Sequence, residues 1–157
     1  QTAYIGFRTP LLSRDAQIKS IIVPIVNFSA AFGDVIASEA IVLGDTIELD
    51  LDGLGIRGLE CNANGCVIIA GSIDDADVFA LYTWSGNAND APVFQSVNLT
   101  GLTPESVVLG DSDNLAGGTT IQLLSDNGRT DWYHTGTNTT GLNTNLRFFQ
   151  SDIIALD

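Results

Sequence analysis

Short runs of apolar and β-branched residues recur along the whole chain, separated by clusters of Gly, Asn, Asp and Ser. Runs of this length between turn residues are typical of β-strands. Helical periodicity is nearly absent: residues 29–40 have some helical composition, but Gly33 and its β-branched neighbours weaken it. We therefore expect an all-β protein. The predicted strands are 2–8, 18–26, 45–51, 55–61, 66–72, 78–84, 93–99, 105–111, 120–126 and 147–156.

The middle strands predict a meander. Four of them follow one another between Gly55 and Leu99, and four antiparallel strands in about 45 residues match one β-propeller blade. A second such unit begins after residue 103, while the first starts late because 2–8 resembles a second strand with no first strand before it. The pattern thus indicates one domain over 1–157, with about three blade-like units at 1–52, 53–103 and 104–157.

Three blades do not make a complete propeller, because closed rings typically have four to eight. We expect either an incomplete ring, closed by association with further copies, or part of a larger propeller whose missing N-terminal blades lie upstream. A β-sandwich of about ten strands is the alternative fold, since periodicity does not distinguish the two architectures.

Charge narrows the set of partners. Six Lys and Arg stand against nineteen Asp and Glu, a formal net charge of -13. Such a chain repels nucleic acid and anionic lipid, and no apolar run approaches the roughly 18 residues of a membrane span. We therefore expect neither nucleic-acid binding nor membrane insertion.

Composition favours an extracellular or cell-surface location. Lys19 is the only lysine, while Asn, Thr and Gly are abundant. The chain has no Met, so with Gln1 first we expect either a removed leader or an excerpt of a longer chain.

Cys61 and Cys66 flank the turn sequence Asn-Ala-Asn-Gly. If the strands on either side pair across this turn, the Cα atoms come within the roughly 7 Å that a disulfide needs. An intracellular protein could instead keep both thiols reduced, and one Cys pair is a poor zinc signal. We expect the disulfide if the protein is exported.

Several segments together resemble an uncharacterised bacterial domain-of-unknown-function family. They are YIGFRTPLL, DGLGIRGLE, VIIAGS, LYTW and RFFQSDIIAL. Members of that family look like β-propellers distantly similar to the esterase-like phytases. The resemblance implies the fold, and that this chain corresponds to the C-terminal portion of a longer member. It implies no activity.

Three arginines, Arg8, Arg57 and Arg147, lie in predicted strands beside apolar residues. A buried guanidinium needs a partner, and Glu60 and Glu105 are candidates in the two strands predicted to be innermost. Arg57 and Glu60 are three residues apart, so a regular strand places them on opposite faces unless Gly58 marks a bulge or one of them ends the strand.

These five charged residues allow two interpretations. They could form a channel mouth that grips carboxylate or phosphate groups, or they could be structural Arg–carboxylate pairs that join neighbouring blades. We favour the structural pairs, because nothing nearby completes a reaction centre.

Two acidic loops are candidate calcium sites, since closely spaced Asp residues supply oxygen ligands. Neither is an EF-hand loop, and the alternative is a solvated turn. The candidate ligands are Asp74, Asp75 and Asp77 in the first loop, and Asp111 and Asp113, with Asn114, in the second.

Familiar catalytic motifs are missing from the sequence, and its single histidine, His134, lies in a loop rich in Gly, Thr and Asn. The leading hypothesis is therefore a secreted or cell-surface propeller module with a non-enzymatic binding or assembly role. The alternatives are a calcium-dependent, phytase-like phosphoesterase and a structural subunit of an extracellular layer or fibre.

Overall fold

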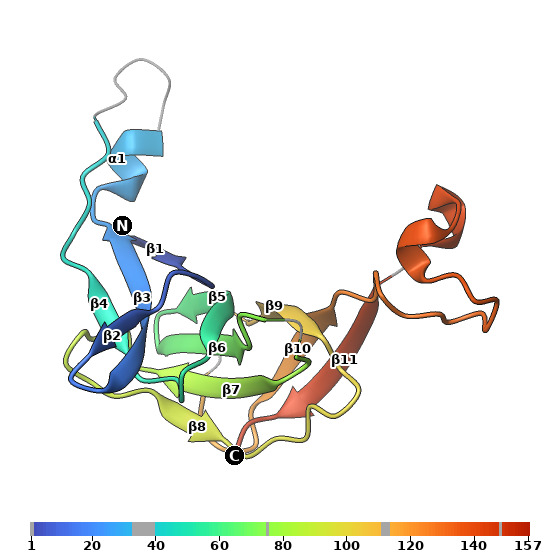
Figure 1. The fold of residues 1–157 in the computed structure, drawn as a ribbon. Helices are drawn as coiled ribbons and strands as arrows, with labels where there is room; N and C mark the ends of the chain where they lie inside the picture. Colours follow the sequence, from blue (N-terminus) through green and yellow to red (C-terminus); the bar gives the residue numbers. More distant parts are fainter. Residues whose placement is uncertain (1, 33–39, 75, 111–113, 148) are drawn as a thin grey trace.

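The computed structural model describes residues 2–32, 40–74, 76–110, 114–147 and 149–157. The protein is mostly β, with three antiparallel sheets of three or four strands, each made from one continuous stretch of chain (Figure 1). The first sheet contains β1 (Ala3–Gly6), β2 (Leu12–Arg14), β3 (Gln17–Ile25) and β4 (Ile47–Leu49). The second contains β5 (Gly55–Asn62), β6 (Gly65–Gly71), β7 (Phe79–Trp84) and β8 (Val93–Gln95). The third contains β9 (Pro104–Val108), β10 (Thr120–Ser125) and β11 (Gln150–Ala155).

All ten predicted strands are present, and the second sheet is the predicted meander, with strand order β5-β6-β7-β8. Cys61 pairs with Cys66 across the β5–β6 turn, and the predicted disulfide is confirmed, with Cα atoms 4.0 Å apart. The sequence pattern missed β2, whose three residues are too few for an alternation to be visible.

Helices are short. Helix α1 (Phe28–Phe32) overlaps the start of the segment with weak helical composition, and residues 33–39 lie outside the described residues. Two 3-10 helices, η1 (Thr139–Gly141) and η2 (Thr144–Leu146), lie between β10 and β11. Among the described residues, no helix is long and apolar enough to cross a membrane.

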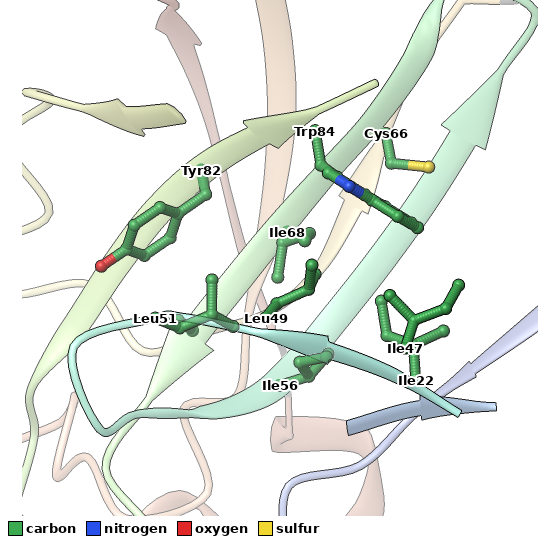
Figure 2. Packing of buried hydrophobic residues seen from close by; sticks show 10 residues of the cluster. Ile22, Ile47, Leu49, Leu51, Ile56, Cys66, Ile68, Tyr82 and Trp84 are labelled. Carbon is green, nitrogen blue, oxygen red and sulfur yellow. The ribbon is translucent and has the colours of Figure 1, made fainter. Parts of the chain in front are cut away.

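The second sheet is covered on both faces, and every residue of β6 is buried. Because side chains alternate along a strand, Ile68 enters one core and Ile69 the other. The first core lies between the first and second sheets, as Figure 2 shows. Its buried residues are Ile22, Ile47, Leu49, Leu51, Ile56, Cys66, Ile68, Ala70, Tyr82 and Trp84. The second core lies between the second and third sheets and contains Val67, Ile69, Leu81, Val107, Ile121, Leu123 and Leu156.

The first strands of the three sheets lie next to one another. The Ile56 amide of β5 donates to the Phe7 carbonyl that follows β1, at 3.1 Å. On the other side, β5 approaches β9 so closely that a Cβ on Gly58 would lie 3.0 Å from the Glu105 carbonyl oxygen. The neighbouring β1, β5 and β9 are all edge strands of their sheets. Across the described residues the three sheets do not close into a ring.

We predict that Ile68→Ala and Ile69→Ala each destabilise the protein by about 2–5 kcal/mol, because each leaves a cavity in a different core. Both isoleucines have no solvent exposure, whereas Ile153 on β11 is 67% exposed. The matched control Ile153→Ala should change stability by less than about 0.5 kcal/mol. Urea unfolding of the three variants measures these differences. A small loss for either core variant would show that one face of the second sheet is not covered.

Candidate functional site

A pocket of about 260 Å³ lies where the three sheets come together, and we call it the arginine pocket. Strands β5, β7 and β9 supply its inner wall, and the loops after β1, β6, β8 and β10 supply the rest. Every sheet therefore contributes to it. The lining residues are Arg8, Arg57, Asp74, Ala76, Asp77, Phe79, Thr103, Glu105, Asp126, Arg129 and Thr130.

Arg57 forms the inner wall. Its side chain is only 9% exposed, and its Nη1 atom donates to Glu105 Oε1 at 2.6 Å. Its Nη2 atom donates to the Ser72 carbonyl, also at 2.6 Å. The guanidinium carbon lies 5.5 Å from the centre of the Phe79 ring, within cation–π range. Both terminal nitrogens are thus held by the protein, so the arginine joins β5 to β9 and to the end of β6.

A β-bulge places Arg57 in this position. Ile56 pairs with Ala70 and Gly58 pairs with Ile69, so Arg57 is the extra residue that has no direct partner on β6. A Cβ on Gly71 would come within 2.9 Å of the Arg57 side chain, so the glycine leaves the space that the guanidinium stem occupies. A bulge at Gly58 was one of the two conditions under which Arg57 and Glu60 would not lie on opposite faces of the strand. The bulge is present, and Gly58 is the residue after it.

Loops place two further arginines at the pocket. Arg8 follows β1 and makes a long hydrogen bond, 3.5 Å, from Nη2 to the Ile73 carbonyl. Arg129 follows β10, and both side chains are exposed. The chain has only six Lys and Arg residues, and three of them line this one pocket. Such a concentration in a chain of net charge -13 is unlike a random distribution of basic residues over the surface.

Carboxylates accompany the arginines. Asp74 Oδ1 accepts from the Ala76 amide at 3.1 Å, and Asp126 Oδ1 accepts from the Gly128 amide at 2.8 Å. These bonds hold the two loops in tight turns, and Thr103 Oγ1 ties the second loop to β9 by donating to the Asp126 carbonyl. A carboxylate has about four acceptor positions, so both groups keep capacity for a ligand.

The structure brings together some of the predicted site residues and separates others. Arg8, Arg57 and Glu105 share the arginine pocket, with Arg57 and Glu105 forming an ion pair. Glu60 instead lines a separate hollow of about 610 Å³ beside β1, where it is the one charged side chain among the described lining residues. Arg147 lies beyond η2 and donates from Nε to the Leu142 carbonyl at 3.0 Å, outside the arginine pocket.

The predicted calcium ligands are only partly described. Asp74 and Asp77 line the arginine pocket, whereas Asp75, Asp111 and Asp113 lie outside the described residues. Within the described ranges, no group of three or more His, Cys, Asp or Glu side chains is placed to hold a metal ion. His134 is not among the residues that line the pocket.

Sequence reasoning missed Arg129, Asp126 and Phe79 as site residues. Arg129 was visible as one of six basic residues, but it lies in a turn-rich segment that no strand pattern connects to β5. Phe79 lies in a predicted strand, and no residue next to it in the sequence indicates that Arg57 packs on its ring.

Comparisons of the chain with protein-family models, with curated proteins and with solved structures find no match.

We predict that Arg57 and Glu105 are coupled by about 1–2 kcal/mol in a double-mutant cycle of Arg57→Met and Glu105→Gln. Glu105→Gln alone leaves a nearly buried guanidinium without its counter-ion, although the 38% exposure of Glu105 moderates the cost. The matched control is the pair Arg14–Glu48, whose side chains are 67% and 28% exposed, with an expected coupling of about 0–1 kcal/mol. Urea unfolding provides the four free energies of each cycle. Equal coupling in the two cycles would contradict the structural role of Arg57.

Proposed function

We propose that the protein is an extracellular binding module, built as three consecutive blades of a β-propeller, that holds a small molecule by an anionic group in the arginine pocket. The observation that carries the proposal is that the three arginines of the pocket come from separate parts of the chain, one from each sheet or the loop that follows its strand. Arg8 lies in the loop after β1 of the first sheet, Arg57 in β5 of the second sheet and Arg129 in the loop after β10 of the third sheet, and all three line one pocket. Arginine is well suited to this task because its planar fork matches carboxylate and phosphate oxygens.

The order of the sheets supports the propeller interpretation. In a propeller, blades of about four antiparallel strands surround a central axis. Here β1, β5 and β9 are each the first strand of a sheet, and all three are neighbouring edge strands. The central sheet is also packed on both faces, as an interior blade must be. The resemblance to a propeller-like family points the same way.

Composition and the disulfide support the extracellular part of the proposal, because disulfides persist in oxidising compartments. The strongly acidic surface also makes the pocket selective. An anionic group is repelled by most of the molecule, so the arginine pocket is where we expect such a group of a ligand to bind. A non-enzymatic role fits the inner wall, in which Arg57 is already held at both terminal nitrogens.

We predict that small carboxylates and phosphates, tested with and without an amine on the same molecule, shift the NMR signals of Phe79 and Arg129. Arg8→Gln should weaken the binding of any compound that does so by about tenfold or more, because it removes a cation from the rim. Arg14→Gln removes the same charge from exposed β2, outside the pocket, and should leave affinity within about twofold. Absence of binding by every compound in the panel would contradict the proposed function. An equal loss in both variants would point to bulk charge instead of the pocket.

A calcium-dependent phosphoesterase is the second candidate. The observation in its favour is that Asp74, Asp77, Glu105 and Asp126 line the same pocket as the arginines, since such an enzyme needs both calcium ligands and phosphate grips. The observation against it is that no three described acidic side chains converge as metal ligands.

We therefore expect no calcium-dependent hydrolysis of p-nitrophenyl phosphate by the purified protein. Release of nitrophenol with calcium and with a chelator measures this directly. Turnover that requires calcium, is lost in Asp77→Asn and is retained in Asp45→Asn would favour the phosphoesterase over the binding module. Asp45 is an exposed acidic residue just before β4, outside the pocket, and so provides the matched control.

A further inference from the structure

The charges of the arginine pocket do not favour a ligand that is purely anionic. Among the described residues, three arginines and four carboxylates line it, which gives these side chains one net negative charge. The whole chain, these residues included, carries a formal charge of -13. A phosphate or a simple carboxylate that entered alone would bring more negative charge to a site that is already negative. Its binding would need a compensating positive charge.

The inner wall cannot supply that charge. Glu105 neutralises Arg57 at 2.6 Å, and the second terminal nitrogen of Arg57 is taken by the Ser72 carbonyl. The Arg57 Nε atom is buried without a hydrogen-bond partner, and a Cβ on Gly71 would lie 3.0 Å from it, so it is packed over the glycine. The other two cations of the pocket, Arg8 and Arg129, are exposed at its rim.

The rim also provides acceptors for a positive group. Asp74 and Asp126 each use one carboxylate oxygen in a turn and retain further acceptor positions, and Asp77 lies on the same loop as Asp74. An ammonium group offers three donors and pairs well with such carboxylates. Donors for an oxyanion and acceptors for an ammonium therefore lie around one pocket. Its volume of about 260 Å³ is just below the range of drug-sized ligand sites, so the occupant must be small.

We propose that the arginine pocket binds a compact zwitterion of the amino-acid class, with its carboxylate on the Arg8 and Arg129 side and its ammonium on Asp74, Asp77 or Asp126. This inference rests on the proposed function and specifies its ligand. A zwitterion brings no net charge, so it uses both kinds of rim side chain without the repulsion that a lone anion meets. It also needs no metal ion.

Three compounds with the same carbon chain test the inference: γ-aminobutyrate, butyrate and butylamine. Titration of the protein with each, followed by NMR, should show γ-aminobutyrate binding at least about tenfold more tightly than the other two. Asp77→Asn should reduce that preference over butyrate several-fold, because it removes an acceptor charge from the rim. Asp45→Asn, which removes a charge elsewhere on the same acidic surface, should leave the preference unchanged.

The outcomes separate this inference from the proposed function. Butyrate binding as tightly as γ-aminobutyrate would overturn the zwitterion and leave an anion site. Butylamine binding as tightly would also overturn it, since the arginines would then have no role. Binding of none of the three would overturn the zwitterion, while phosphates or other carboxylates could still bear out the broader function. An equal effect of Asp77→Asn and Asp45→Asn would assign the preference to overall charge and contradict the assignment to the rim.

Discussion

Burial of both faces of β6 is the constraint on which the rest of the structure depends. An antiparallel sheet commonly keeps one face in water, but here Ile68 and Ile69 are both fully buried on opposite sides of one strand. Two further sheets are needed to cover these two faces, and the chain supplies one before and one after the meander. Hydrophobic burial thus fixes the order of the three sheets, with the second sheet in the centre.

The site follows from that order. In this protein the first strands of the three sheets come together, and β5 lies between β1 and β9. The bulge leaves Arg57 without a pairing partner on β6. Its charged side chain instead forms an ion pair with Glu105 where β5 and β9 are in contact. A nearly buried guanidinium is costly unless it is paired, so this ion pair is a requirement of the packing and at the same time the inner wall of a pocket. Loops from all three sheets then form the rim.

The strands and the central meander were predictable from the sequence, but a propeller arrangement of the sheets is not shown, and about half of the pocket residues were named. Strands appear in sequence as local alternation, which is why β5 to β8 and the Cys61–Cys66 disulfide were correctly predicted. The candidate partners of Arg57 could be named, but the choice of Glu105 over Glu60 depends on which sheet lies next to β5. That is a long-range property of packing. Arg129 was missed for the same reason, since only the tertiary structure places its loop near Arg8.

The sequence raised the question of whether the strand arginines are structural or functional, and the structure gives each residue its own answer. Arg57 is held by Glu105, by a backbone carbonyl and by the Phe79 ring, so its charge is used within the protein. Arg8 is exposed, and its hydrogen bond to the Ile73 carbonyl is long. The proposed binding role would use this arrangement, because the fixed inner arginine keeps the walls of the pocket in place while a ligand would meet the exposed rim. The structural interpretation therefore applies to Arg57, and the proposed binding role concerns the rim, so the two do not compete.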